Sequence, residues 1–461
     1  MRQKQAMNSL TASQSVNGAS RTVRVGESLR LVNGRAFKPT EWKKSGLPIV
    51  RIQNLNNPDA PFNYYEGQLP EKFLLDDGDL LFAWSGTPGT SFGAHIWRRG
   101  RAWLNQHIFK VHFDDKQFDK RYLQLAINRN LEQYIRAAHG GAGLAHITKG
   151  RFEESTLPCL PLDEQQRIVA EIEKQFTRLD AGMASLKRVQ IALKRYRASV
   201  LKAACEGRLV PIEAELARKE NHSYETGEEL LRRILEERRK KWKGKGKYKE
   251  PATPAIVGLL TLPEGWTWAG LDQLMLNITD GDHQPPPHTN SGVPFLVIRD
   301  VRSGKLDFGD TRFVSREYAN QVEPFRKPAR GDILYTLVGS YGIALRVTTD
   351  QEFCIQRHIG VLRPHALSPA DYLAHVLNSS FVFRQAGKVA TGTAQMTVPL
   401  AGLRRIVIPL PPIHEQERIV AEIERRLSVT EQLEATIHSS LGRANRLREA
   451  TLHQAFSSDL Q

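Results

Sequence analysis

PCLPLDEQQRIVAEIEKQFTRLDAGMASLKRVQIALKRYRASVLKAACEGRL, residues 158–209, returns as PLPPIHEQERIVAEIERRLSVTEQLEATIHSSLGRANRLREATLHQAFSSDL, residues 409–460. The two copies align without a gap at a shift of 251 residues. Between Glu164–Glu173 and Glu415–Glu424 a single position differs, Gln166 against Glu417. A repeat of this length indicates that the chain carries the same architecture twice.

Each copy has the pattern of one long helix. In the first copy, apolar residues from Ile168 to Val200, with Val189 and Tyr196 among them, recur every three or four positions, which places them on one face. The second copy has a similar stripe, made of Ile419, Ile423, Leu427, Leu433, Ile437, Leu441 and Leu447. Asp163 is the predicted N-cap, and Gly207 stands where a helix usually ends. At about 1.5 Å per residue such a helix would be about 60 Å long. The simplest way to bury both apolar faces is to pack the two helices against each other. A coiled coil of this kind can be purely structural, with no function of its own.

Composition sets limits on the class of protein. A chain of 461 residues exceeds one typical hydrophobic core, so we expect two or more domains. The net charge of +15 favours a polyanionic partner. The sequence contains no run of about 18 apolar residues, so it predicts no membrane span. Its first twenty residues are polar and lack the apolar core of a signal peptide. The three cysteines are isolated, which predicts neither disulfides nor a metal site and favours the cytoplasm.

The order of segments predicts a head, a rod, a connector, a second head and a second rod. Residues Asp77–Gly86 (DGDLLFAWSG) correspond to Arg330–Gly339 (RGDILYTLVG), and Asn105–Ile108 (NQHI) corresponds to Gln356–Ile359 (QRHI). Outside such anchors the two heads diverge. We expect a disordered start at 1–20, a first globular domain at 21–157, a long helix at 158–209, a connector with a short basic helix at 210–261, a second globular domain at 262–408, and a second long helix at 409–461.

The connector contains a strongly basic run. Residues Arg238–Lys249 carry eight basic side chains in twelve positions, with Trp242 and Tyr248 between them. Such a run can grip phosphates and stack on nucleic acid, or it can be a solvated helix end that leads into a linker. The sequence leaves these two readings open.

Recognisable catalytic motifs are missing from the sequence. It has no phosphate loop of the form G-x-x-x-x-G-K-[ST], no glycine-rich dinucleotide fingerprint, and no Asn-Pro-Pro-aromatic stretch of the kind that holds a flipped base. His107 and His358 occupy matching places in the two heads. The sequence alone leaves open whether these histidines are catalytic, read bases or are structural. We therefore predict no catalytic residue and no metal ligand in this chain.

Several stretches together resemble one known family. The helix openings LPLDEQQRIV and LPPIHEQERIV, the LPEGW stretch at Leu262–Trp266, the G-D-[IL]-L strands at Gly78 and Gly331, and the connector resemble type I restriction–modification specificity subunits. The similarity covers nearly the whole chain after Arg21. The first half lacks the LPEGW opening, and His414 stands where the first copy has Asp163.

The resemblance implies an α+β protein with pseudo-two-fold repetition. Two α/β target-recognition domains would be held apart by two long helices packed as an antiparallel coiled coil. Each domain would read one part of a split, asymmetric sequence in double-stranded DNA, and the chain itself would not be an enzyme. Two modification subunits would supply S-adenosylmethionine-dependent methylation, and restriction subunits would use ATP and Mg²⁺. The complex would be cytoplasmic, in a bacterium or archaeon, with no membrane partner.

Base-reading residues are expected in loops of the two heads, above all among Arg, Asn, Gln and His side chains, because these can contact bases in the grooves. The candidates in the first head are Arg35, Lys38, Asn54, Arg98, Arg99, Arg101, Asn105 and Gln106. Those in the second head are His283, Gln284, Arg299, Asp300, Tyr341, Gln356 and Arg357. The alternative hypotheses are a coiled-coil scaffold whose heads bind proteins and, less favoured, an independent nuclease.

Overall fold

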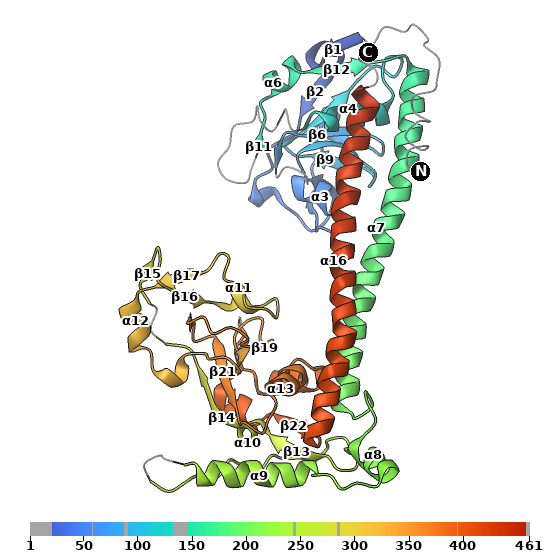
Figure 1. The fold of residues 1–461 in the computed structure, drawn as a ribbon. Helices are drawn as coiled ribbons and strands as arrows, with labels where there is room; N and C mark the ends of the chain where they lie inside the picture. Colours follow the sequence, from blue (N-terminus) through green and yellow to red (C-terminus); the bar gives the residue numbers. More distant parts are fainter. Residues whose placement is uncertain are drawn as a thin grey trace. The chain divides into compact units, whose positions relative to one another are not determined.

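The computed structural model describes residues 21–57, 59–86, 91–131, 134, 145–242, 246–283, 286–393 and 395–457 (Figure 1). Its internal contacts divide the chain into two compact units. Unit 1 comprises Met1–Leu186 and Ser439–Gln461, and unit 2 comprises Lys187–His438. The long helices α7 (Leu162–Cys205) and α16 (Ile413–Ser457) both cross this division, so each unit contains part of both.

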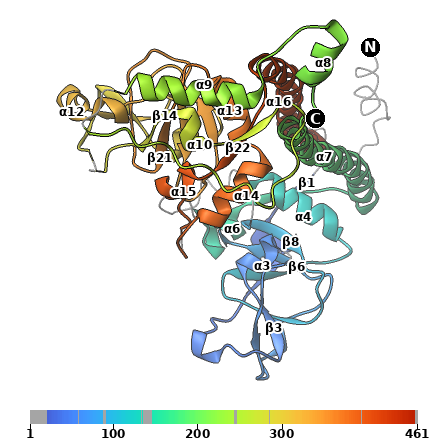
Figure 2. The ribbon, with the colours of Figure 1, turned by 90° about the horizontal axis from the view of Figure 1, so that it is seen from below.

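Unit 1 is built on a four-stranded antiparallel sheet. Its strand order is β2 (Arg30–Asn33), β10 (Ile108–His112), β6 (Leu80–Ala83) and β8 (Gly93–Ile96). All four residues of β6 are buried, because alternate side chains of a strand point to opposite faces and both faces are covered. Leu80 and Phe82 join one apolar cluster together with helix α4 (Lys120–Arg129), while Leu81 and Ala83 join another. Figure 2 shows α4 against the β8 side of this sheet.

A second sheet of unit 1 has the order β4 (Asn63–Tyr65), β3 (Leu47–Val50), β9 (Ala102–Leu104) and β5 (Leu74–Leu75), with β3 and β9 parallel. Two short pairs complete the strands: β1 (Arg21–Arg24) with β12 (Thr156–Cys159), and β7 (Ser85–Gly86) with β11 (Ala145–His146). The short helical elements are α2 (Val25–Ser28), η1 (Pro39–Glu41), α3 (Ile52–Asn56), η2 (Glu71–Phe73) and α6 (Lys149–Glu154).

Unit 2 has a central sheet of the same pattern, in the order β14 (Met275–Asp280), β21 (Ile359–Pro364), β18 (Ile333–Thr336) and β19 (Ala344–Arg346). Its second sheet runs β15 (His288–Thr289), β17 (Arg312–Val314), β16 (Val293–Leu296) and β20 (Cys354–Ile355), and β13 (Thr267–Gly270) pairs with β22 (Val407–Leu410). Its helical elements are α8 (Glu213–Glu220), α9 (Gly227–Lys240), α10 (Leu271–Leu274), α11 (Ile298–Val301), α12 (Arg316–Gln321), η3 (Pro324–Arg326), α13 (Ala370–Leu377), α14 (Ser380–Val389) and α15 (Leu400–Arg404).

Matching hydrogen bonds occur in the two units. Asn128 accepts from the backbone N–H of Ala94 at 2.8 Å and donates to its carbonyl at 2.9 Å. Asn378 makes the same two bonds to Ala344, at 3.1 and 2.7 Å. The correspondence between the halves therefore extends from sequence anchors to individual side chains that tie a helix to an edge strand.

The two long helices run antiparallel within unit 1. Gln175 of α7 accepts from Thr451 of α16 at 3.3 Å, and Asp180 of α7 accepts from Arg448 at 2.8 Å. Residue numbers therefore rise along α7 in the direction in which they fall along α16. At the end of α16, the buried Phe456 packs on Tyr122 of α4, with ring centroids 5.1 Å apart.

The apolar stripe predicted along these helices is buried only in part. Ile419 and Ile423 of α16 share the core of unit 2 with Val200 and Leu201 of α7. In contrast, four predicted stripe residues are 42% to 54% exposed, namely Val189, Tyr196, Leu433 and Leu447. That part of the prediction was wrong, because periodicity marks an apolar face but cannot tell whether a third element covers it.

The predicted start of the first long helix also needs correction. Helix α7 begins at Leu162, directly after Pro161, so Asp163 lies in its first turn and is not the N-cap. The helix ends at Cys205, and Gly207 has a φ of 65°, as expected for a glycine after a helix end. No helix in the described part of the chain is both long enough and apolar enough to cross a bilayer.

Candidate nucleic-acid interface

One end of the central sheet in unit 1 collects polar and aromatic side chains, most of which are half-buried. After β2 the chain passes close to the turn between β9 and β10. Gly34 donates to the carbonyl of Ile108 at 3.2 Å, and Arg35 donates to that of Leu104 at 2.9 Å. A Cβ on Gly34 would lie 2.1 Å from the carbonyl oxygen of Asn105, so no larger residue fits without moving backbone. We call this end edge 1, defined by Asn33–Arg35, Trp84, Asn105–His107 and His146.

Aromatic contacts organise the side chains of edge 1. Trp84 donates from Nε1 to Asn33 at 3.3 Å, and its ring centroid lies 5.2 Å from His107 and 4.7 Å from His146. The Nε2 atoms of Gln106 and His107 are 3.1 Å apart. Burial lowers the pKa of His107, and the nearby His146 and Arg51 lower it further. A neutral imidazole both donates and accepts hydrogen bonds, as base edges require.

Unit 2 repeats this backbone arrangement at the same end of its central sheet. Gly281 follows β14 and donates to the carbonyl of Ile359 at 3.1 Å, and a Cβ there would lie 2.2 Å from the carbonyl oxygen of Ile355. Leu337 donates to the carbonyl of His358 at 2.9 Å, as Trp84 does to that of His107 at 3.3 Å. We call this end edge 2, defined by Asp280–Asp282, Leu337 and Gln356–His358.

The side chains of edge 2 differ from those of edge 1. Asp280 is paired with Arg326 at 2.6 Å and with His283 at 2.9 Å. Burial lowers the pKa of His358, and the charge of Arg357 lowers it further. Arg357 is exposed, and the described residues offer its guanidinium no hydrogen bond or ion pair. The two edges thus share a backbone frame and present different hydrogen-bonding groups.

Several of the predicted base readers lie at or beside these edges. Arg35, Asn105 and Gln106 belong to edge 1, and Gln356 and Arg357 belong to edge 2. Lys38 is exposed in the loop after edge 1, and His283 is exposed beside edge 2. Tyr341 lies in the loop after β18, where its ring stacks on Phe383 at 5.3 Å. Gln284 lies outside the described residues.

The structure buries three predicted readers and gives two of them internal hydrogen bonds. Asn54 is 1% exposed, accepts from the N–H of Arg51 at 3.0 Å and donates to the carbonyl of Ala60 at 3.2 Å. Asp300 is 6% exposed and accepts from the N–H of Val297 at 2.8 Å. Both side chains shape the start of a short helix, and Asn105 is only 8% exposed. Loop chemistry in the sequence does not reveal this burial, and DNA contact by these three side chains stays a prediction.

The basic residues after β8 lie at the other end of the sheet. Trp97 donates to the carbonyl of Asp79, which precedes β6, whereas edge 1 lies at the end of β6. Arg99 stacks over the ring of Trp97 at 4.7 Å and donates to the carbonyl of Asn54. The remaining predicted residues away from the edges are Arg98, which is exposed, Arg101, which pairs with Asp76 at 3.6 Å, and Arg299, which pairs with Asp300 at 3.0 Å.

Sequence reasoning missed Trp84, His146 and Arg51. The available signal was the pair of glycines that directly follow the first strand of each central sheet, in Asn33-Gly34-Arg35 and Asp280-Gly281-Asp282. A glycine at matching places indicates a close backbone approach. Only the fold shows which residues that approach brings together.

The sequence profile of the type I restriction modification DNA specificity domain matches residues 19–190 and 286–442. This chain belongs to that family. It is 27% identical over 439 residues to the type I restriction enzyme EcoBI specificity subunit of Escherichia coli, covering 93% of this chain and 84% of that one. It is 22% identical over 412 residues to the MjaVIII specificity subunit of Methanocaldococcus jannaschii, covering 87% of this chain and 84% of that one.

A solved structure shows the same fold. It belongs to a study of complex assembly and conformational transition of the type I R-M system, and it covers 97% of this chain and 100% of its own at a TM-score of 0.59 and 21% identity. Family membership supports DNA sequence recognition as the function. It does not support the scaffold reading, in which the heads bind only proteins.

Proposed function

We propose that this chain is the non-catalytic specificity subunit of a type I restriction–modification complex and reads a bipartite, asymmetric DNA sequence. The observation that carries the proposal is the pair of edges. In each edge a glycine lies against the turn that carries a histidine of lowered pKa. This backbone frame is the same in both edges, but the side chains around it differ. Equivalent frames with different hydrogen-bonding groups suit the reading of two different half-sequences.

The target-recognition domains in this proposal are residues 21–157 and 262–408, joined by the connector at 210–261. The helical segments at 158–209 and 409–461 form an antiparallel coiled coil that holds the two domains apart and fixes the unread spacer. Two features support this arrangement. The helices α7 and α16 have 44 and 45 residues without a break, and they contact each other in both units.

The partners in the proposal are double-stranded DNA, two modification subunits and restriction subunits, in the cytoplasm of a bacterium or archaeon. The names of the relatives, which are specificity subunits of type I restriction enzymes, support it. S-adenosylmethionine, ATP and Mg²⁺ would be cofactors of the partner subunits, with none in this chain.

Substitution at one edge tests the assignment of half-sequences. Gln106→Ala at edge 1 and Arg357→Ala at edge 2 each remove a side chain that can contact a base, and a good contact of this kind is worth about 1–3 kcal/mol of discrimination. With modification subunits co-expressed, methylation mapping should show one half-sequence relaxed by each variant and the other unchanged. Arg98→Ala is the matched control, since Arg98 is exposed at the opposite end of the sheet.

Exchange of a whole domain provides the broader test. Replacing residues 21–157 by the corresponding domain of a relative should change one half of the methylated sequence and leave the other half intact. An unchanged methylated sequence, or the loss of both halves in a folded chain, would contradict the proposed division.

A further inference from the structure

The helix of the connector is held firmly on unit 2. Leu230 and Ile234 of α9 are fully buried in the core of that unit. At the end of the helix, Arg238 donates to the carbonyl of Gln273 at 3.0 Å and to that of Asp272. Figure 1 shows α9 beside α10, directly before β14. The basic run that follows therefore starts from a fixed position.

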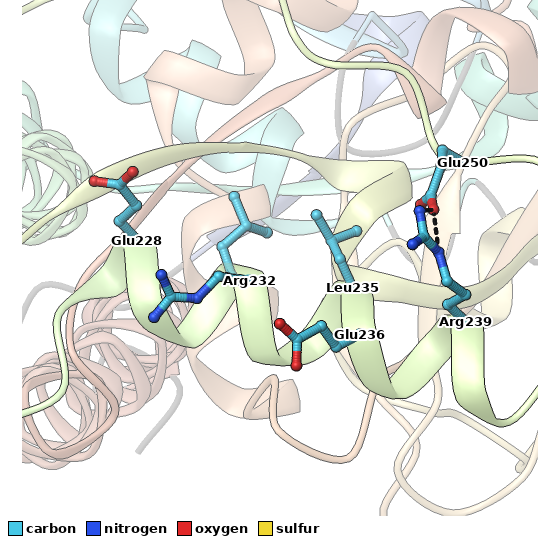
Figure 3. A pocket seen from close by; sticks show the side chains of 7 residues that line it. Glu228, Arg232, Leu235, Glu236, Arg239 and Glu250 are labelled. Atoms are coloured by element: carbon cyan, nitrogen blue, oxygen red, sulfur yellow. Dashed lines mark hydrogen bonds and ion pairs between the residues drawn. The ribbon is translucent and has the colours of Figure 1, made fainter.

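The two described ends of this basic run contact each other. Arg239 donates from Nε to Glu250 at 2.7 Å, and Trp242 contacts Tyr248 with ring centroids 5.7 Å apart and planes at 62°. We call residues Arg239–Trp242 and Gly246–Glu250 the basic loop. Figure 3 shows the Arg239–Glu250 pair at one end of a groove of about 380 Å³ along α9. That groove has acidic and basic side chains in nearly equal number, so its charge does not favour an anion.

Part of the positive charge of the basic loop has no acidic partner among the described residues. Residues 238–249 contain eight basic side chains and no acidic one. Lys241 pairs with Glu237 at 2.8 Å, and Arg238 and Arg239 are engaged as described. Lys240, Lys247 and Lys249 are exposed, and no described residue forms an ion pair with any of them. Beside them the ring of Trp242 is 48% exposed, although it is the largest apolar side chain of the loop.

The basic loop lies away from the proposed reading surface of its own unit. Arg238 contacts the residues just before β14, whereas edge 2 lies at the end of that strand. A strand of six residues spans roughly 20 Å at about 3.3 Å per residue. A ligand at the loop is therefore separate from the base pairs that edge 2 would contact.

We propose that the basic loop is a second, sequence-independent site that binds single-stranded nucleic acid. Lys240, Lys247 and Lys249 bind phosphates, and an unpaired base stacks on Trp242. An exposed indole between lysines matches the stacking platforms of single-strand binding proteins, since every base offers a π-face to it. In a duplex the bases are stacked inside, so the lysines would find phosphates but the indole would find no base.

Fluorescence anisotropy with the full chain tests this site. The probes are labelled oligothymidylate of about 15 nucleotides, which exceeds or matches typical site sizes, and a random duplex of equal length. The triple variant Lys240→Ala/Lys247→Ala/Lys249→Ala should bind the single strand at least about tenfold more weakly. Its salt dependence should be shallower by about two, since each phosphate contact on a single strand contributes about 0.7 to the slope. The triple variant Lys187→Ala/Lys194→Ala/Lys219→Ala loses the same charge elsewhere and should bind as wild type.

Substitution of the indole distinguishes stacking from charge alone. Trp242→Ala should weaken binding of the single strand by about fivefold or more, while Trp242→Phe should retain most of it. Circular dichroism should show unchanged folding, because Trp242 is half exposed. Equal losses in the two lysine variants, no effect of Trp242→Ala, or tighter binding of the duplex through the same lysines would each overturn the proposal. None of these outcomes depends on which duplex sequence the heads read.

Discussion

Replacing Gly34 by alanine tests the frame of edge 1. A Cβ at this position would lie 2.1 Å from the oxygen and 2.4 Å from the carbon of the Asn105 carbonyl group, both of which are backbone atoms. Since non-bonded atoms prefer about 3.5 Å, the turn at residues 105–107 would have to move by roughly 1 Å. Overpacking of this kind costs about 1–3 kcal/mol of the free energy of unfolding. For a unit of this size, that corresponds to a melting temperature about 2–12 °C lower.

The assay combines thermal unfolding with methylation mapping in cells that carry the modification subunits. Gly34→Ala should lower the melting temperature and impair recognition of one half-sequence, because the turn carries Gln106 and His107. Gly281→Ala is the counterpart in unit 2, where the Cβ would lie 2.2 Å from the Ile355 carbonyl oxygen. It should impair the other half-sequence.

Gly150→Ala is the control for both variants. Gly150 lies in α6 with no atom within 4 Å of a Cβ, so alanine should leave stability unchanged or raise it by up to about 1 kcal/mol. If Gly34→Ala had the melting temperature of the wild type and left the methylated sequence intact, the close approach of Gly34 to Asn105 would contribute neither to stability nor to recognition. The reasoning that places the reading surface at edge 1 would then be refuted.

Three further outcomes are expected. Phe456→Ala should lower the free energy of unfolding, measured in urea, by about 3–5 kcal/mol, because the buried Phe456 ring packs on Tyr122. The control Leu447→Ala should change that free energy by less than about 0.5 kcal/mol, because Leu447 is 54% exposed. Burial raises the pKa of Glu415 from its usual 4.5 to about 7, so the folded state keeps a proton that the unfolded state loses, and stability should fall as pH rises through that range. Urea unfolding on both sides of the range measures this loss, and Glu415→Gln, which does not titrate, should remove most of the difference. Arg51→Ala should raise the pKa of His107, as NMR titration of the imidazole would show, because the nearby guanidinium charge helps to lower it.

The internal repeat and the helical character of its two copies follow from the sequence, since both are expressed in local patterns. A period of three to four residues defines a helix wherever it occurs, and matching anchors such as those at His107 and His358 align the heads. The partners of each apolar stripe do not follow from the sequence. Val189 and Leu447 have the same pattern as the buried Ile419 and Ile423, yet they are exposed because none of the described elements covers them.

The sequence by itself therefore determined the duplication, the long helices, the basic charge and the resemblance that places the chain in its family. Only the tertiary structure decided which polar residues share a surface. It brought Gly34 against Asn105, turned Asn54 and Asp300 inward, and placed Arg98–Arg101 at the opposite end of the sheet. The physical reason is that a helix is specified by neighbours a few residues apart, whereas the end of a sheet is assembled from chain segments tens of residues apart whose contacts no local pattern records.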